Sequence, residues 1–262
     1  MTSKDDVRSI LPEPFEWCEI PAGAVTVTDP KTPFFREEDY EETFNVHPFV
    51  MAKYPVTYAQ FQLFADEAVE DGFEPGQQTW QIDDHPRENV SWRDAIAFCD
   101  WLNARLQLPQ LSPLIRLPVG DLTVANLADF KGIRPPVEWE WQWAAQGSDG
   151  RTYPWGNDFD SNRCNCEESG IKQTTPVDRY PAGASPFGVM DMTGNVWEWC
   201  LNNYNSPREI LPGNPMDQRV KRGGGWESSA DASRVVHRGL WSAERRGLST
   251  GFRLACGLSA SS

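Results

Sequence analysis

Cysteines are the most reactive side chains in this sequence of 262 residues, because a thiolate can act as a nucleophile or as a soft metal ligand. Cys164 and Cys166 come closest to a motif, but they are one residue short of a CxxC pair, and no histidine lies nearby to complete a zinc set. An even number of cysteines permits disulfides, yet no spacing supports them, so we expect free thiols and a reducing compartment. The six positions are Cys18, Cys99, Cys164, Cys166, Cys200 and Cys256.

Histidines are the second group that could hold a metal ion. His47, His85 and His237 are far apart in the sequence, so a metal centre would require them to converge in space. His85 precedes a predicted helix, where packing or capping is the simpler role. We therefore do not expect the three histidines to form a metal centre.

Charge is distributed unevenly along the chain. The formal net charge is −14, which disfavours a nucleic acid or an anionic membrane as the partner of the whole surface. Residues 219–253 nevertheless carry a local charge of +5, from seven arginines and one lysine against three acids. We expect Arg222, Arg238 and Arg253 to pair with carboxylates inside the protein.

The membrane and targeting patterns are equally informative. No run of eighteen apolar residues is present, so we expect no membrane insertion. The first residues contain no apolar segment of the kind found in secretory leaders, so we expect a cytoplasmic location.

Three helices can be predicted from their caps and apolar stripes. The first begins after Thr57 and ends before Gly72, and the second begins after Ser91, with Asp94 completing a near capping box. The third follows Pro135-Pro136 and stops at Gly147. Their apolar stripes contain Phe61, Phe64, Ala65 and Ala68, then Ala95, Phe98, Cys99, Leu102 and Leu106, then Trp139, Trp143 and Ala144.

The rest of the chain predicts short strands and ordered loops. Residues 17–28 contain extended pieces around a turn, and further strands are plausible at 195–200, 219–223 and 251–256. The sequence after Gly147 is rich in Gly, Pro, Asn, Asp and Trp, and an aromatic content of 12% is too high for a disordered tail. We expect an α+β fold with one domain over residues 1–262.

Seven segments, in order and at matching spacing, resemble the formylglycine-generating enzyme or sulfatase-modifying factor family. They are KYPVTYAQFQLF (53–64), HPRENVSWRDAIAFCDWLN (85–103), VEWEWQWAAQG (137–147), YPWGN (153–157), SPFGVMDMTGNVWEW (185–199), RVKRGGGW (219–226) and GFRLA (251–255). The resemblance implies a variant of the C-type lectin fold with short strands, about three helices and much irregular loop. Residues 120–132 depart from the pattern as an insertion, which is either a ligand-facing flap or, as the default interpretation, a tolerated surface loop.

The family's enzyme oxidises a substrate cysteine with two cysteines and copper, and this chain lacks both cysteines. The resemblance places Ser228 and Ser233 at their positions, and Gly225 replaces the serine of the motif. No cysteine occurs between Cys200 and Cys256. We therefore expect no formylglycine-generating activity and no copper.

The resemblance also implies a calcium site in the tract from Asp191 to Glu198. Its ligands would be the Asp191 and Glu198 carboxylates and the Gly194 and Val196 carbonyls. Hard oxygen ligands of this kind are the set that Ca²⁺ prefers. The alternative is that the two acids only bond loop amides.

The C-terminal segment, about 219–256, resembles the cassette of variable proteins of diversity-generating retroelements, which also runs from a Gly-Gly-aromatic motif to Gly-Phe-Arg. Between these ends the sequence has no helical or strand period. Serine hydroxyls and single aromatic rings are typical of adaptable binding surfaces. The expected contact residues are Glu227, Ser228, Ser229, Asp231, His237, Gly239, Leu240, Trp241, Ser242, Gly247, Leu248 and Ser249.

These observations favour a non-catalytic recognition protein that displays residues 227–250 to a protein ligand and acts as a monomer. In this interpretation Trp241 is exposed, whereas Trp226 and Phe252 are buried anchors of the loop ends. The alternative function is a metal-dependent oxidase or oxygenase of the same family with altered chemistry. A third possibility is a regulatory scaffold module, which no particular residue supports.

Overall fold

The computed structural model of the protein describes residues 5–29, 39–112, 130–210 and 218–258. Its strands form a four-stranded sheet of order β1-β4-β10-β5, a two-stranded sheet β2-β3 and a four-stranded sheet of order β8-β7-β6-β9. The strands are β1 (Trp17–Ile20), β2 (Gly23–Asp29), β3 (Tyr40–Val46), β4 (Phe49–Ala52), β5 (Ile133–Arg134), β6 (Trp197–Asn203), β7 (Gln218–Arg222), β8 (Gly239–Ser242), β9 (Thr250–Gly251) and β10 (Ala255–Gly257).

The first two helices begin where their capping residues predict. In α1 (Tyr58–Ala68), the Thr57 hydroxyl accepts a hydrogen bond from the Gln60 amide, and the Gln60 side chain accepts one from the Thr57 amide. In α2 (Trp92–Arg105), Ser91 and Asp94 form the same reciprocal pair. Both predictions are confirmed, because each cap satisfies amides that have no partner within the helix.

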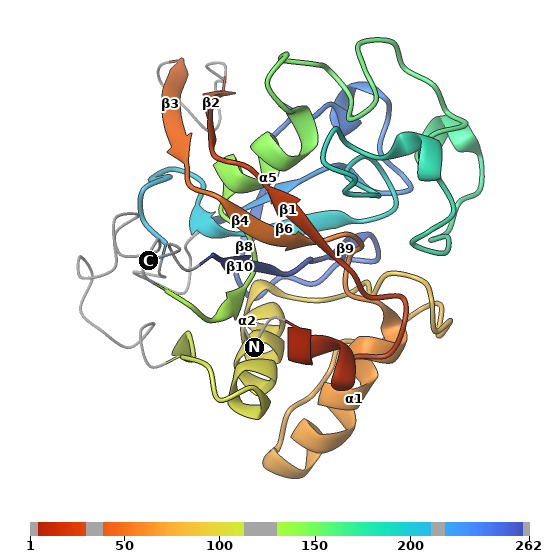
Figure 1. Cartoon of the computed structure of the whole chain (residues 1–262). Helices are drawn as coiled ribbons and strands as arrows, with labels where there is room; N and C mark the ends of the chain where they lie inside the picture. Colours follow the sequence, from red (N-terminus) through yellow and green to blue (C-terminus); the bar gives the residue numbers. More distant parts are fainter. Residues whose placement is uncertain (1–4, 30–38, 113–129, 211–217, 259–262) are drawn as a thin grey trace.

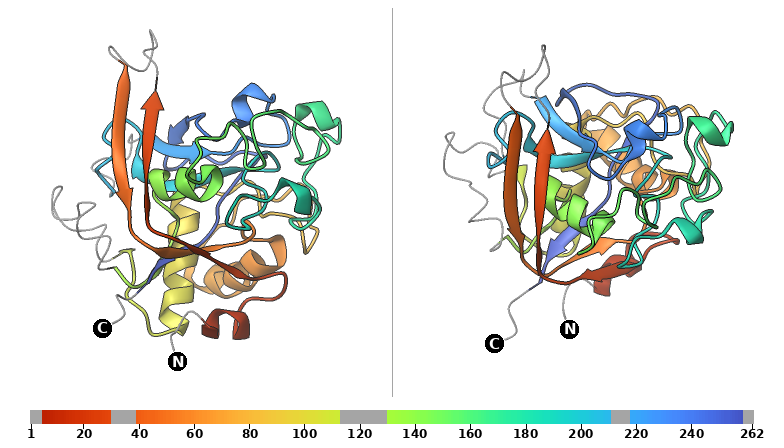
Figure 2. Two further views of the ribbon diagram at one scale, coloured as in Figure 1. Left: turned by 45° about the horizontal axis from the view of Figure 1, so that its top comes forward. Right: turned by 90° about the horizontal axis from the view of Figure 1, so that it is seen from above.

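The third helix, α5 (Glu138–Gln146), ends at Gly147 as predicted, with a φ of 67° that favours glycine. It packs against β2, β3, β6 and β7, whereas α2 packs against β5 and β6. Figures 1 and 2 show α1 and α2 side by side below the central strands and α5 above them. Trp92, Trp141 and Trp199 are fully buried between these layers.

Loops and single turns make up much of the chain between Gly147 and β6. The described 3-10 turns are η1 (Asp5–Ser9), η2 (Val69–Asp71), η3 (Glu167–Ser169), η4 (Pro181–Gly183) and η5 (Asp231–Ser233). The expected α+β architecture with short strands is therefore confirmed. Most of the insertion expected at 120–132 lies outside the described residues.

Four of the described strands were missed by the sequence, namely β3, β4, β5 and β8. Residues 239–242 were expected to have no regular structure, but they form β8, which pairs antiparallel with β7. Gly239, Leu240, Trp241 and Ser242 give no alternation of apolar and polar residues, because the strand is half-buried throughout.

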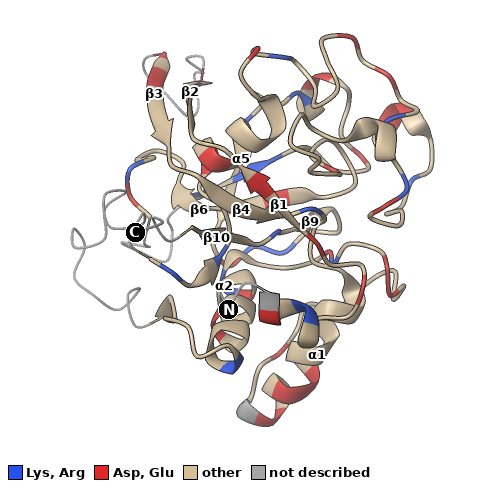
Figure 3. Cartoon of the chain, viewed as in Figure 1, with Lys and Arg blue, Asp and Glu red and all other residues tan. Residues whose placement is uncertain are grey.

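The surface is acidic on several elements, and Figure 3 shows Asp and Glu recurring along α1 and the outer loops. Within the described residues, no helix is both long enough and apolar enough to cross a bilayer.

Candidate ligand-binding site

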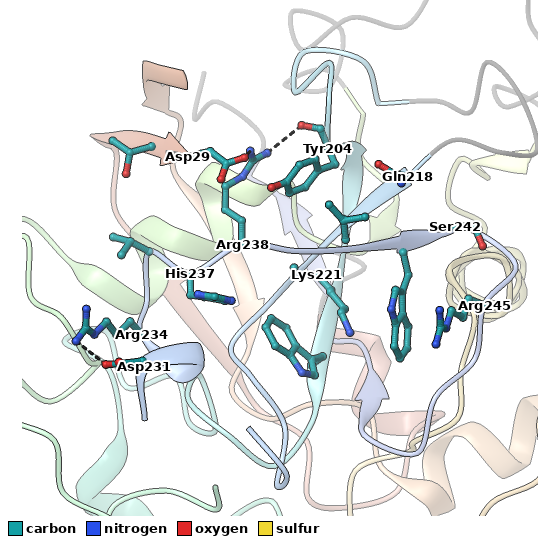
Figure 4. Close-up of a pocket in the computed structure, with 16 residues that line it drawn as sticks. Asp29, Tyr204, Gln218, Lys221, Asp231, Arg234, His237, Arg238, Ser242 and Arg245 are labelled. Carbon is teal, nitrogen blue, oxygen red and sulfur yellow. Dashed lines mark hydrogen bonds and ion pairs between the residues drawn. The ribbon is translucent and has the colours of Figure 1, made fainter. Parts of the chain in front are cut away.

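The main candidate site is an open cavity of about 970 Å³ over β7 and β8. Its walls come from the ends of β2 and β6, from the two strands themselves and from the segment that joins η5 to β8 (Figure 4). Several of its lining side chains are exposed to solvent, namely those of Asp231, Arg234, Val236, His237 and Arg245. The cavity is therefore accessible to a ligand.

Strand register explains which side chains meet at the floor of the cavity. Lys221 in β7 lies opposite Gly239 in β8, and Trp241 lies two residues further along β8, so it shares the face of Gly239. A Cβ atom at position 239 would lie 2.8 Å from both the Lys221 Cγ and the Trp197 ring. Glycine at this position therefore makes room for the lysine and the indole.

Lys221 is 93% buried and lies between two indole rings. Its Nζ is 4.6 Å from the centroid of the Trp197 ring and 3.4 Å from that of the Trp241 ring. Burial lowers the pKa of Lys221 to about 7, while Glu227 raises it and Arg245 lowers it. The Arg245 guanidinium also packs on Trp241, 4.3 Å from the centroid of its ring.

The acids of the cavity already have cationic partners. Arg238 donates to Asp29 at 2.8 Å and Arg234 donates to Asp231 at 2.6 Å. Figure 4 shows Asp29 and Arg238 together at one end, with Lys221 between His237 and Arg245. The cavity thus presents positive charge, in a protein whose formal net charge is −14.

Behind the cavity, buried ion pairs fix its framework. Glu138 at the start of α5 accepts hydrogen bonds from Arg222 and Arg238. Burial works against the ionised form of Glu138, but the two guanidinium groups outweigh it and hold the pKa of this carboxyl below its usual value. Arg253 pairs with Glu198 at 2.5 Å. The internal pairing expected for these three arginines is confirmed.

Half of the expected contact residues line the cavity. Trp241 is half-buried, so the prediction that it is substantially exposed is wrong. It loses exposure because Lys221, Arg245 and Gly247 pack against its ring. The lining residues among those expected are Asp231, His237, Gly239, Leu240, Trp241 and Ser242.

The other expected contact residues lie elsewhere. Ser228 and Ser249 are buried, which contradicts their expected role as surface contacts. The Ser228 hydroxyl accepts from the Gly225 amide, and the Ser249 hydroxyl donates to Glu227. Those expected residues that do not line the cavity are Glu227, Ser228, Ser229, Gly247, Leu248 and Ser249.

The two anchors of the segment behave differently. Phe252 is fully buried, as expected. Trp226 was expected to be buried and is only partly so. Its ring packs edge-on to Trp80, and its indole N–H donates to the Leu248 carbonyl at 3.3 Å. A hydrogen bond to a surface loop keeps this ring near solvent.

Several lining residues were missed by the sequence. Lys221 belongs to the motif RVKRGGGW, which carries the family resemblance, and Trp197 lies in the tract interpreted as a cation site. Their convergence depends on the pairing of β7 with β8, and β8 itself was not predicted. The local charge of +5 was the one available indication of a positive cavity.

The positions of the family's cysteines do converge. A Cβ atom on Gly224 would lie 2.5 Å from the Ser233 Oγ and 3.2 Å from the Ser228 Cβ, so both serines lie against this glycine. Ser233 is fully buried, and its hydroxyl has no hydrogen-bond partner among the described residues. Neither serine lines the cavity.

The calcium prediction can be compared with the partners of its two carboxylates. Asp191 accepts a hydrogen bond from Asn195 on one oxygen, and the other oxygen is buried without a partner among the described residues. Both Glu198 oxygens are bound by Arg253, and one also accepts from the Trp141 indole. Asp191 fits a cation, but Glu198 would have to leave Arg253 first. Gly194 and Val196, the other two expected ligands, are buried. Calcium binding at this tract stays a prediction.

The cysteine thiols form no metal centre in the described part of the chain. All six cysteines are free and buried. The Cys164 and Cys166 sulfurs lie 3.7 Å apart, so this pair is closer than its spacing indicated. No group of three or more His, Cys, Asp or Glu side chains in the described ranges is placed to hold a metal ion.

Comparison with known proteins gives consistent family relationships. The profile of the sulfatase-modifying factor enzyme 1-like domain matches residues 12–258. A bovine protein named inactive C-alpha-formylglycine-generating enzyme 2 is 31% identical over 170 residues, which are 61% of this chain and 44% of that protein. The formylglycine-generating enzyme of Thermomonospora curvata is 29% identical over 69% of this chain and 58% of its own length. The chain thus spans less than half the length of the bovine relative.

Solved structures share the fold. Variable protein 1 of Treponema denticola superposes with a TM-score of 0.68 at 24% identity, over 92% of this chain and 95% of that one. PvdO from Pseudomonas aeruginosa gives a TM-score of 0.69 at 21% identity, over 92% and 94% of the two chains. At these identities the likeness concerns the fold alone.

Proposed function

Because the chain belongs to the sulfatase-modifying factor enzyme 1-like family, we propose that it uses the family scaffold to recognise a protein ligand rather than to catalyse a reaction. The cavity over β7 and β8 carries this proposal, since it gathers half of the expected contact residues in one accessible place. Exposed side chains on a fixed framework are typical of recognition surfaces.

The relatives support the same direction. One is named an inactive formylglycine-generating enzyme, and one structural neighbour is titled a variable protein. Ser228 and Ser233 stand where the family's cysteines are expected, and a hydroxyl is neither a soft copper ligand nor a thiol nucleophile. The alternative, an oxidase with altered metal chemistry, gains no support from the described residues.

A matched pair of libraries tests the recognition function. One library randomises exposed residues of the cavity, namely Asp231, Arg234, Val236, His237 and Arg245. The control library randomises equally exposed residues elsewhere, namely Asn157, Asp158, Asn162, Glu167 and Lys172. Both are displayed on cells and selected against the same panel of unrelated soluble proteins.

We expect both libraries to retain the fold and only the cavity library to yield specific binders. Surface substitutions usually change the free energy of unfolding by less than about 0.5 kcal/mol, so folding should survive in both. Equal yields from the two libraries, or collapse of the cavity library, would rule out a dedicated recognition surface here.

A further inference from the structure

The Lys221 ammonium has an unusual set of neighbours for a buried cation. Indole faces attract a cation but provide no hydrogen-bond acceptor, whereas an ammonium carries three donors. No hydrogen bond or ion pair of the Lys221 Nζ is formed with any described residue. Arg222, Arg238 and Arg253 each have a carboxylate partner, so Lys221 differs from these neighbouring cations.

The missing acceptors can come only from the cavity side. Glu227 is the acid whose charge raises the pKa of Lys221. Its carboxylate accepts a hydrogen bond from the Ser249 hydroxyl, and it does not line the cavity. Asp29 and Asp231, which do line it, are paired with Arg238 and Arg234. An anion entering the cavity would therefore reach Lys221 without first displacing a described carboxylate from an ion pair with it.

A second cation lies on the other side of the same ring. Arg245 packs on Trp241 at 4.3 Å, and it forms no ion pair with any described carboxylate. Lys221 and Arg245 thus flank Trp241 with two uncompensated charges, at the floor and at the exposed rim of the cavity. This charge arrangement complements an acidic group that approaches along the indole.

The residues that line the cavity indicate whether a phosphate or a carboxylate fits it better. Phosphate carries nearly two negative charges and is usually met by guanidinium forks or several amides, but the Arg245 guanidinium here packs against the indole. Trp197 and Trp241 instead provide apolar surface for the methylene groups beside a carboxylate. We propose that Lys221 binds a carboxylate of the protein ligand, from an acidic side chain or a C-terminus, between Trp197 and Trp241. This inference rests on the proposed recognition function.

Lysine NMR tests the subsite without knowledge of the natural ligand. Protein labelled with ¹³C at lysine Cε is titrated with N-acetylglutamate, with N-acetylglutaminamide, which carries no carboxylate, and with inorganic phosphate. The Lys221 resonance is assigned by its loss in Lys221→Arg, and exposed Lys172 provides the internal control. We expect N-acetylglutamate alone to shift the Lys221 signal and to raise its apparent pKa by about one unit, as an opposite charge at contact distance does.

Arg245→Gln provides an independent variant, because this exposed side chain is not part of the core. It should weaken the affinity for N-acetylglutamate by about two- to fivefold, the effect of one exposed charge. An equal response to N-acetylglutaminamide would show that charge is not recognised, and a larger response to phosphate would overturn the choice of a carboxylate.

The outcomes separate this subsite from the wider function. A Lys221 signal that ignores N-acetylglutamate, while the cavity library still yields binders, overturns the carboxylate subsite alone. A carboxylate response together with equal yields from both libraries would instead keep the subsite and remove the proposed protein-recognition role.

Discussion

Burial of the charged Lys221 side chain at the floor of the cavity destabilises the folded state. Its pKa falls from a usual value of 10.5 to about 7, so between these pH values the unfolded chain binds more protons than the folded one. The free energy of unfolding therefore rises with pH across that window, and the full destabilisation by Lys221 is present below pH 7. A residue that weakens the fold while serving a ligand is common in binding sites.

Replacement of Lys221 by methionine should remove this cost and keep the packing against the two rings. We expect Lys221→Met to raise the free energy of unfolding by about 0.5–2 kcal/mol at pH 7, with a gain that shrinks toward pH 10. Urea unfolding of both proteins at several pH values measures the difference. Lys172→Met, at an exposed position, should show no such trend. A gain that grows with pH would contradict the assigned charge state.

Trp241 combines a binding position with a packing role. Its ring contacts Lys221 and Arg245 and covers Gly247, so truncation removes cation–π contacts and part of the packing. We expect Trp241→Ala to cost about 1–3 kcal/mol, between the effect of a surface change and that of a core truncation. Chemical unfolding measures it, with Leu248→Ala, at a side chain 50% exposed, as the control. A loss above about 3 kcal/mol would make Trp241 a core residue and weaken the recognition proposal.

Asp191 is the residue at which calcium can be tested. If Ca²⁺ binds to its unpartnered oxygen, saturation at a hundred times the dissociation constant stabilises the fold by about 2.7 kcal/mol. We expect EDTA to lower the melting temperature of the wild type by several degrees and to leave Asp191→Ala unaffected. Thermal melts with EDTA and with added Ca²⁺ measure both effects. An unchanged wild-type melt would show that Asp191 is only a hydrogen-bonding carboxyl.

At the scale of elements, local chemistry determined what could be predicted. The starts of α1 and α2 and the end of α5 follow from Thr57, Ser91 and Gly147, whose side chains or backbone act within a few residues. β8 could not be predicted, because its place depends on β7, nearly twenty residues earlier in the chain. The cavity depends on that pairing, so only half of the expected contact residues line it, and Lys221 was missed.

Glu138, at the start of α5, is a fully buried carboxylate behind the cavity. Glu138 neutralises both Arg222 and Arg238, and all three side chains are buried. We expect Glu138→Gln to cost about 3–5 kcal/mol, because it leaves the buried Arg222 without a counter-charge and Arg238 with Asp29 alone. Asp160→Asn, which breaks the exposed pair with Arg163, should cost at most about 1 kcal/mol. Similar losses for the two variants, measured by urea unfolding, would contradict this account of the framework.

At the scale of the whole molecule, the chain keeps the family's fold, and the resemblance places serines at the positions of its two cysteines. We expect no aldehyde to form on a cysteine-containing sulfatase peptide, with or without Cu(I), because Ser228 and Ser233 stand at the family's cysteine positions. Aldehyde capture followed by mass spectrometry measures the product, with an active formylglycine-generating enzyme as the positive control. Product above the level of an enzyme-free blank would restore the oxidase alternative.

The buried residues within 227–250 have a genetic consequence. Arg238 is tied to two carboxylates, and Ser233, Val235 and Ala243 are fully buried, so these codons tolerate little change although they lie among exposed ones. Heritable variation in this stretch would have to skip them. The repertoire of sequences open to such a gene is therefore set by the pattern of permissible codons, and not by the length of the stretch.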